Sequence, residues 1–338
     1  MRKYLLPENG NFYKANLHSH SNISDGMLSP AELKSLYKSR GYSVFAYTDH
    51  DVFIPHHDLT DDSFLVLSGF EAEFYIERKN PTKKTCHVCF IAKTPDITVQ
   101  PCFNKEYARS GNAASHVDEV AFDEREEPFV RFYSPESINS MIKTAREKGF
   151  FVTYNHPAWS LESFNEYSKY EGMHAMEIFN SECQKAGYES YAPHVYDDML
   201  RLGKKIFVTA TDDNHNFFSP DDPRCSSFGG FTMIKAKSLD YTDVTDALFA
   251  GDFYASQGPE IYGLYTENGK IHITCSDAVS ILFNTAYRTS QRRFASRENP
   301  INEADFDLKV TDTYFRITVT DAFGRHADTR AYFLSDIE

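Results

Sequence analysis

The sequence lacks an apolar run long enough to act as an export signal or to span a bilayer. Its first residues, MRKYLLPENG, carry two basic side chains but no such run. We therefore expect a cytoplasmic protein that does not interact with membranes.

Cysteine is scarce as well, with six residues scattered over a chain of 338. Their spacing matches neither a disulfide framework nor a paired zinc knuckle, so we expect reduced core residues. Cys86 and Cys89 flank His87 and resemble a CxxC pair. The alternation of a buried strand explains this pair better than redox chemistry does.

Basic side chains are outnumbered by acidic ones, 35 to 49, which gives a formal charge of −14. A surface of this charge repels long polyanions, so nucleic acid is a disfavoured partner. Small molecules remain as candidate ligands. The composition does not indicate an oligomeric state.

Helix signals followed by strand signals recur through the first two thirds of the chain. Ser29, Pro30 and Glu32 open a predicted helix, and Gly41 ends it before the strand-like segment YSVFAYT. The same order returns at 134–155 and 196–211, and further strands are predicted at 64–69, 87–92 and 174–179. Repeated units of this kind predict an α/β fold with a mainly parallel sheet, open or closed.

Two stretches depart from this order. Residues 94–133 are polar and have no sustained period, which indicates an insertion or a lid. From residue 259 onward the sequence alternates and turns like antiparallel hairpins. We therefore predict a main domain at 1–258 and a small all-β module at 259–338, which binds a ligand, shields an edge of the main domain or mediates assembly.

Imidazoles and carboxylates stand at the predicted strand ends, where functional side chains of a parallel barrel emerge. His18 and His20 occupy alternate positions, so both side chains point to one face. Neutral imidazole together with carboxylate suits zinc, manganese or iron, and there are more candidates than one tetrahedral ion can use. The candidates at strand ends are His18, His20, Asp25, Asp49, His50, Asp51, Glu71, His87, His156, Asp212, Asp213 and His215.

The remaining histidines lie outside these motifs, and such a histidine is usually a satisfied surface or core residue. His56 and His57 follow Asp51 and either face solvent, which we favour, or meet a substrate. The isolated ones that we interpret as structural are His116, His174, His194, His272 and His326.

The order of these motifs resembles that of the PHP family, named for polymerase and histidinol phosphatase. The matching features are HxH followed by four residues and DG, then TDHD, a glutamate after the third strand, isolated histidines and a late DxH. The resemblance covers residues 12 to about 258. It implies a distorted (β/α)7 TIM-like barrel, here with a small C-terminal β-sandwich-like domain, and a trinuclear metal centre that hydrolyses phosphate esters.

The resemblance also implies how three divalent ions, Zn, Mn or Fe, are shared among the candidate residues. The first ion is assigned to His18, His20, Glu71 and Asp213, the second to Glu71, His87 and His156, and the third to Asp25, His50 and His215. Asp25 stands where some members have histidine, so the metal preference of the third site stays open. Asp213 is preferred to Asp212 because it forms DxH with His215, and His116 is the alternative to His87.

One arginine is a candidate for binding substrate. Residues 221–259 resemble the end of the barrel in small-molecule members of the family. There Arg224 is placed to meet a phosphate, because a guanidinium matches phosphate oxygens in pairs. A surface ion pair with Asp221 or Asp222 is the equally weighted alternative.

The resulting hypothesis is hydrolysis of a small phosphate monoester, such as a nucleotide or sugar phosphate, by a metal-bridging hydroxide. Asp49, His50 and His215 are the candidates for proton transfer to the leaving group. One alternative is an amidohydrolase-like enzyme that cleaves C–N or C–O bonds, ranked lower because the family layout lacks a catalytic lysine bridge. The other is a non-catalytic metal-binding scaffold whose β module binds a glycan or protein.

Overall fold

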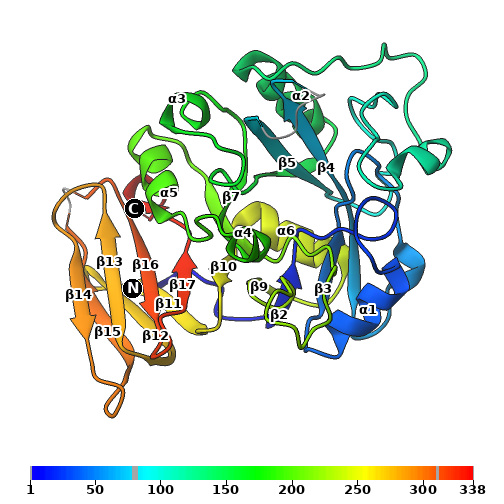
Figure 1. The fold of residues 1–338 in the computed structure, drawn as a ribbon. Coiled ribbons are helices and arrows are strands. Elements are labelled where there is room, and N and C mark those ends of the chain that lie inside the picture. The colour runs from blue at the N-terminus through cyan, green and yellow to red at the C-terminus, as the bar shows by residue number, and fades with distance from the viewer. Residues whose placement is uncertain (1, 78–82, 310–311, 338) are drawn as a thin grey trace.

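The computed structural model describes residues 2–77, 83–309 and 312–337. The chain has a mixed α/β fold with a large mixed sheet and few helices. An α/β part, blue to yellow in Figure 1, lies beside a block of antiparallel strands drawn in orange and red. Within the described residues, none of the helices combines the length and apolarity needed to cross a membrane.

The α/β part contains most of the helices and the strands that carry the site. Its strands are β2 (Asn11–Asn16), β3 (Val44–Tyr47), β4 (Leu65–Tyr75), β5 (Thr85–Ala92), β6 (Phe150–Tyr154), β7 (Ala175–Asn180), β8 (Phe207–Thr211), β9 (Phe231–Ala236) and β10 (Phe253–Ser256). Its α-helices are α1 (Pro30–Lys38), α2 (Pro135–Glu147), α3 (Phe164–Tyr167), α4 (Ser181–Ala186), α5 (Pro193–Arg201) and α6 (Tyr241–Ala250). Three short 3-10 turns are η1 (His57–Leu59), η2 (Ala113–Ser115) and η3 (Val117–Glu119).

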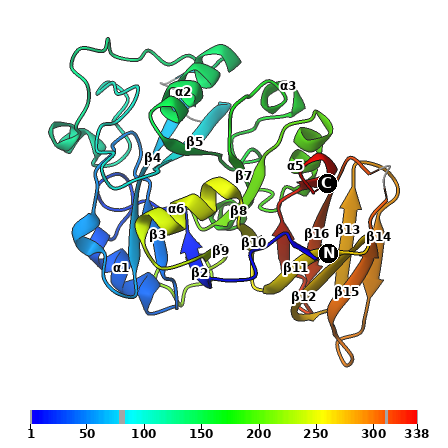
Figure 2. The same ribbon diagram turned by 180° about the vertical axis from the view of Figure 1, so that it is seen from behind.

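The predicted cap of α1 is present. The Ser29 side chain accepts a hydrogen bond from the Glu32 backbone, and Glu32 accepts one from the Ser29 backbone N–H at 2.8 Å. This reciprocal bonding satisfies two N–H groups that the first helical turn leaves free. Leu33 and Tyr37 are the buried residues of α1. Figure 2 shows α6 lying across the back of β2, β3 and β9, with Val244 and Leu248 in their shared core.

The sheet is mixed, so the prediction of a mainly parallel sheet is wrong. Strands β2, β3 and β4 run parallel, as do β6, β7 and β8. However, β5 is antiparallel to both β4 and β6, and β9 is antiparallel to β2 and β10. The link from β4 to β5 is too short to hold a crossover helix, so the two strands pair as a hairpin.

The strand order of the main sheet ends at β8. Within the described residues, no strand ladder joins β8 to β9 or β2, so main-chain pairing does not complete a ring of strands. The ends are nevertheless adjacent, because Ser19 forms a bridge with Asn214 and the Asp213 N–H donates to the His18 carbonyl at 3.1 Å. The segments that follow β2 and β8 therefore meet at one place.

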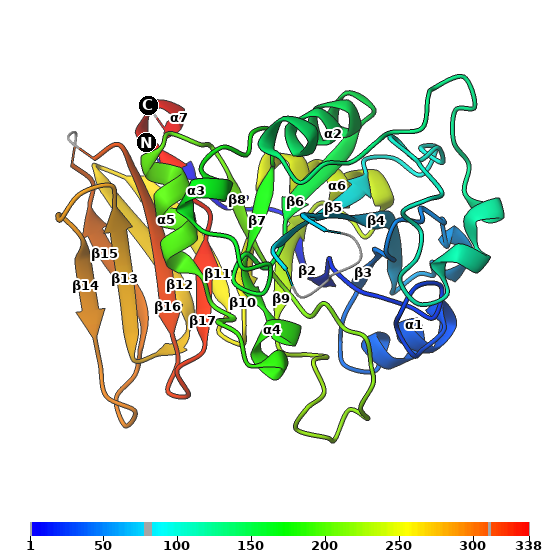
Figure 3. The same ribbon diagram turned by 45° about the horizontal axis from the view of Figure 1, so that its top comes forward.

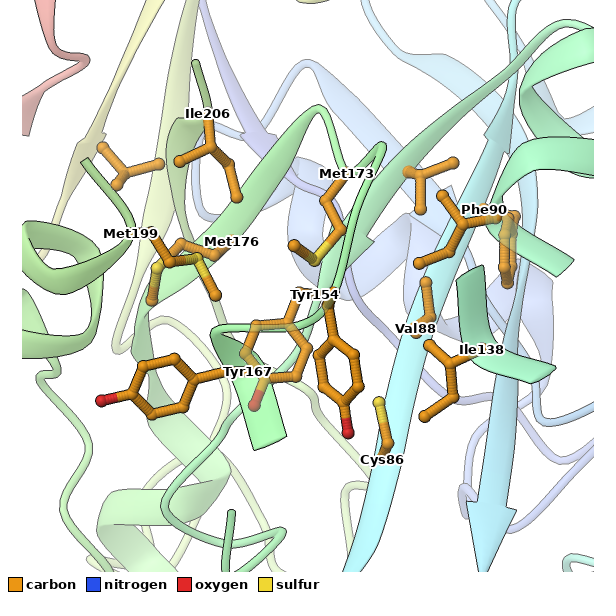
Figure 4. Close-up of a cluster of buried hydrophobic side chains, with 14 of the residues drawn as sticks. Cys86, Val88, Phe90, Ile138, Tyr154, Tyr167, Met173, Met176, Met199 and Ile206 are labelled. Atoms are coloured by element: carbon orange, nitrogen blue, oxygen red, sulfur yellow. The ribbon is translucent and has the colours of Figure 1, made fainter. Parts of the chain in front are cut away.

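A continuous core supports the strands on the side of α2 and α5. Figure 4 shows Val88 on β5 facing Ile138 on α2, and Met176 on β7 beside Met199 on α5. These side chains are fully buried. Their packing fixes the positions of β5 and β7, both of which carry side chains of the site described below.

The insertion at 94–133 contains only the two turns η2 and η3 among the elements assigned to it. It is nevertheless fastened to the α/β part. The Asn112 N–H donates to the Ser24 carbonyl at 2.7 Å, and the guanidinium of Arg131 forms a buried ion pair with Asp51. The insertion therefore forms a fixed wall beside the end of the sheet.

The C-terminal module is built from antiparallel strands, as the alternating pattern predicts. Its strands are β11 (Ile261–Glu267), β12 (Lys270–Ala278), β13 (Ser280–Thr285), β14 (Gln291–Phe294), β15 (Ile301–Asp307), β16 (Tyr314–Thr320), β17 (His326–Thr329) and β18 (Tyr332–Phe333), followed by the one-turn helix α7 (Leu334–Ile337). One of its sheets has the order β1-β11-β12-β15, where β1 (Lys3–Tyr4) comes from the start of the chain.

The second sheet of the module is continuous with the sheet of the α/β part, because β17 pairs with both β16 and β10. The predicted boundary at residues 258–259 falls in the link between β10 and β11. Figure 3 shows α5 lying against β16 and β17. There the Arg316 guanidinium makes two bonds, of 2.8 and 3.0 Å, to the carboxylate of Asp197 on α5.

Candidate metal centre

All nine residues that the motifs propose as metal ligands gather around one cavity. They come from the ends of β2, β3, β6 and β8 and from the interior of β4 and β5. The nine are His18, His20, Asp25, His50, Glu71, His87, His156, Asp213 and His215.

Glu71 lies at the middle of this group. Its Oε1 is 3.2 Å from His18 Nε2, 3.4 Å from His87 Nδ1 and 3.3 Å from His156 Nε2. Its Oε2 is 3.1 Å from His50 Nδ1. We expected Glu71 to follow the end of its strand. It lies instead inside β4, where it is 1% exposed. One carboxylate thus faces imidazoles from four separate segments.

Asp213 forms a second point of contact. Its Oδ1 is 3.0 Å from His20 Nε2 and 3.3 Å from His18 Nε2. Asp213 has φ 52° and His156 has φ 26°, both in the left-handed region that side chains with a Cβ seldom adopt. Strained backbone of this kind concentrates at functional sites, where the surrounding structure enforces it.

Asp25, His50 and His215 form a third group at the edge of the cavity. The Asp25 oxygens lie 3.5 Å from His50 Nε2 and 3.5 Å from His215 Nε2. The rings of His50 and His215 stack on His20, with centroids 4.2 and 4.4 Å away. This group therefore shares His20 as a neighbour with the group around Asp213.

Several atoms of the cluster are buried without a hydrogen-bond partner. Among the described residues these include His20 Nδ1, His50 Nδ1, Glu71 Oε2 and His87 Nε2, and the 3.1 Å contact between His50 Nδ1 and Glu71 Oε2 does not have the geometry of a hydrogen bond. Buried polar atoms are almost always paired, and four exceptions in one cavity point to a common ligand. Because nitrogen and oxygen lone pairs converge there, the donor set fits divalent cations.

The cluster also shifts the proton affinities of its members. Burial lowers the pKa of His50, but the carboxylates of Glu73, Asp25 and Glu71 outweigh it and raise the pKa to about 10. Burial likewise opposes protonation of His215, yet Asp25 raises its pKa to about 9. Without metal, protonated His50 and His215 face these carboxylates, so cations and protons compete for the same atoms.

Three residues of the site were missed by sequence reasoning. Glu177, on β7, places Oε1 2.7 Å from His18 Nδ1 and accepts a hydrogen bond from the His156 backbone N–H at 3.0 Å. Asn155 donates to Glu71 at 2.6 Å, and Glu73 Oε1 lies 3.1 Å from His50 Nδ1. A lone carboxylate inside the apolar segment HAMEIF was the available signal for Glu177.

Asp49 lies next to the cluster but turns away from it. Its carboxylate accepts hydrogen bonds from the backbone and hydroxyl of Ser21, both at 2.8 Å, and from the hydroxyl of Ser24 at 2.6 Å. Asp49 thus holds the turn that leads to Asp25. Asp212 is also directed elsewhere, since it accepts from the backbone N–H groups of residues 228–230.

Arg224 lies outside the cavity. Its side chain is 64% exposed and pairs with Asp222 through bonds of 2.9 and 2.7 Å. It also stacks over Phe218, with the guanidinium carbon 3.9 Å from the ring centroid. His116, the alternative to His87, is paired with Glu119 at 2.7 Å and does not line the cavity.

The cavity has a volume of about 330 Å³, a size typical of pockets for small molecules. Among the described residues that line it, none is lysine or arginine. Beyond seven of the nine candidate ligands, its walls are formed by Glu73, Tyr75, Ser110, Trp159, Glu182, Cys183 and Phe217.

No protein-family model matches the sequence, and a search of curated proteins gives no match. Solved structures resemble it distantly. A two-domain protein from Bacteroides vulgatus containing a predicted PHP-like metal-dependent phosphoesterase aligns over 94% of both chains, with 14% identity and a TM-score of 0.43. A provisionally named metal-dependent phosphoesterase from Bifidobacterium adolescentis aligns over 64% of this chain and 91% of its own, with 15% identity and a TM-score of 0.38.

An amidohydrolase from Chromobacterium violaceum, solved with sulfate and no metal, aligns over 62% of this chain and 93% of its own. Its identity is 16% and its TM-score is 0.33. Similarity at these TM-scores does not assign an activity to this chain.

Proposed function

We propose that this chain is a metal-dependent hydrolase that releases phosphate from a small phosphate monoester. The observation that carries the proposal is the convergence of nine imidazole and carboxylate side chains on one cavity, with buried lone pairs that lack partners. Such a donor set suits metal-assisted hydrolysis better than a structural role, because a structural zinc site needs only four ligands.

Three ions would share these side chains. His18, His20 and Asp213 would hold one, His87 and His156 another, and Asp25, His50 and His215 the third, with Glu71 between the first two. Zn, Mn and Fe all accept such ligands. Bound divalent ions would polarise the phosphoryl oxygens and lower the pKa of a coordinated water.

Other residues of the chain hold the candidate ligands in place. Glu177 orients the ring of His18 and holds the backbone of His156, and Asn155 orients Glu71, so His18 presents a fixed lone pair to the cluster. Of the candidates for proton transfer to the leaving group, His50 and His215 would serve only when they do not coordinate the third ion. Asp49, which holds the Ser21–Ser24 turn, is better suited to keep Asp25 in place.

An anionic substrate needs positive charge that the cavity wall does not provide. Because none of the described lining residues is lysine or arginine, attraction of the phosphoryl group would depend on the bound ions. This also explains how a protein of charge −14 would bind an anion.

The test is metal analysis of the purified protein followed by assays of phosphate release from nucleotides, sugar phosphates and histidinol phosphate with added Mn²⁺. We expect bound metal and release from at least one ester, both lost in Glu71→Gln but kept in His116→Gln, which changes a histidine outside the cluster. Full metal occupancy without phosphate release from any ester would count against the proposal. Cleavage of a lactone or amide panel instead would favour an amidohydrolase-like activity.

A further inference from the structure

The wall of the cavity beyond the candidate ligands is aromatic. Trp159 lies edge-on to His87 and His156, with ring centroids 5.1 and 5.2 Å away. Phe217 stacks parallel to His215 at 5.6 Å and is 59% exposed. The half-buried ring of Trp159 and the exposed ring of Phe217 offer a surface on which a planar apolar group can stack.

The charged side chains of the same wall, Glu73 and Glu182, are acidic. Glu182 lines the cavity and belongs to none of the donor sets assigned above, so its carboxylate would stay free of a coordinated ion. The Tyr75 hydroxyl is directed to Glu73 and donates a hydrogen bond to it. A second anionic group on a ligand would meet carboxylate oxygens there and no cationic side chain among the described lining residues.

The volume of the cavity limits the size of the ligand. About 330 Å³ is near the lower end for ligand pockets, so it suits one ring system together with a phosphoryl group. The position of the rings next to the imidazoles places such a group beside the atoms that would hold the ions.

We propose that the alcohol part of the substrate is an uncharged planar ring system that packs on Trp159 and Phe217, and that esters with a second anionic group are rejected. This inference rests on the proposed function, because it takes the phosphoryl group to lie at the metal centre. It makes Trp159 and Phe217 determinants of specificity and gives Glu182 the role of excluding anions.

Non-hydrolysable phosphonates test binding without turnover. Trp159 is the only tryptophan in the chain, so its fluorescence reports on the cavity directly. In protein loaded with Mn²⁺, we expect benzylphosphonate to bind about tenfold more tightly than methylphosphonate, because stacking on an aromatic side chain contributes binding energy. We expect 4-carboxybenzylphosphonate to bind at least about tenfold more weakly than benzylphosphonate, owing to the acidic wall.

Calorimetry of variants tests whether Trp159 and Phe217 cause the preference for benzylphosphonate. Trp159→Ala and Phe217→Ala should each reduce the preference for benzylphosphonate, whereas Trp159→Phe, which keeps a ring, should retain most of it. Phe294→Ala, on an exposed residue of β14, is the matched control and should leave the preference intact. Glu182→Gln should reduce the difference in affinity between benzylphosphonate and 4-carboxybenzylphosphonate.

The outcomes separate this inference from its premise. Equal binding of all three phosphonates, or retention of the preference in both alanine variants, overturns the inference and leaves the proposed function standing. If none of the three binds the Mn²⁺-loaded protein, the inference and the proposed function are both overturned.

Discussion

Glu177 acts on the candidate metal centre through two residues rather than by facing the cavity. One of its oxygens lies 2.7 Å from His18 Nδ1, which leaves Nε2 of the same ring directed at Glu71 and Asp213. A carboxylate behind an imidazole fixes the tautomer of the ring and raises its basicity. Glu177 is therefore part of the site although it does not line the cavity.

The variant Glu177→Gln should lower metal affinity about 10–100-fold, because a neutral amide supports the imidazole less well. Competition against a chelator of known affinity measures the change. Glu298→Gln, at an exposed position in the link after β14, is the control and should bind metal like the parent protein. Equal affinities for all three proteins would show that Glu177 does not support the centre.

A second buried carboxylate affects stability rather than the site. Burial raises the pKa of Glu162 to about 7, although the hydroxyl groups of Tyr154, Tyr170 and Tyr133 donate hydrogen bonds to it and oppose the rise. Its ordinary pKa is 4.5. The folded protein therefore binds this proton more tightly than the unfolded chain does.

The contribution of this proton to stability is complete below pH 4.5 and is lost as pH rises through about 7. It amounts to about 3 kcal/mol. We expect the difference in free energy of unfolding between the parent and Glu162→Gln to change by about this amount from pH 4.5 to pH 8, in favour of the variant at high pH. Urea denaturation at several pH values measures it. A difference independent of pH would refute the assigned pKa.

At the residue scale, the sequence predicted the members of the cluster that belong to spaced motifs, such as His18 and His20. It did not reveal Glu177 or Asn155, because their roles depend on which strands become neighbours. Glu177 reaches His18 only because β7 lies beside β6 and β8 and the ends of β8 and β2 meet. No local pattern encodes that proximity.

At the scale of elements, the attachment of the insertion depends on one glycine. Gly111 has φ +53°, and a Cβ on it would lie 2.1 Å from the Ser24 carbonyl oxygen and 2.6 Å from the Asp25 Cα. These backbone atoms cannot move without shifting Asp25. The insertion and the third donor group are thus packed directly against each other.

The variant Gly111→Ala should lower the free energy of unfolding by about 2–5 kcal/mol, the sum of overpacking and left-handed backbone strain. It should also speed proteolysis within residues 94–133, because the insertion is displaced from its contact. Thermal denaturation and limited proteolysis measure the two effects.

Gly203→Ala provides the control. Gly203 has a similar φ of +82°, but a Cβ there meets no atom within 4 Å. Gly203→Ala should therefore lower the free energy of unfolding only by the backbone strain, about 1–2 kcal/mol. If both variants lose the same stability, the close contact of Gly111 with Ser24 contributes nothing.

The elements themselves were largely predictable from local signals. Capping residues located α1 and α2, and short aromatic or β-branched runs located β3 and β6. Strand direction was not predictable in this way, because periodicity is the same in parallel and antiparallel strands. The antiparallel placement of β5 follows instead from the short link after β4.

At the scale of the whole molecule, the two parts are joined by main-chain pairing and by a buried ion pair. β10 and β17 form one ladder, and Arg316, only 5% exposed at its side chain, pairs with Asp197 on α5 and with Asp328 on β17. Contacts of this kind couple the stability of both parts. We therefore expect calorimetry to show one unfolding transition.

Arg316→Ala should destabilise the protein by about 3 kcal/mol or more, because it leaves the buried Asp328 without its cation. Arg325→Ala is the matched control. Arg325 pairs with Asp321 on the same hairpin and is 49% exposed, so its loss should cost less than about 1 kcal/mol. Two separate transitions in the parent protein, or equal effects of the two variants, would contradict this coupling.

The pairing of β1 with β11 has a consequence for synthesis. Lys3 lies opposite Thr266 in the ladder, and Leu5 and Leu6 are buried in a core that includes Ile261 and Leu264 of β11. At a translation rate of about 5–20 residues per second, this early segment waits on the order of ten seconds or more before its partner leaves the ribosome. During that interval its leucines are open to chaperones, and the module cannot be completed until β11 has been synthesised.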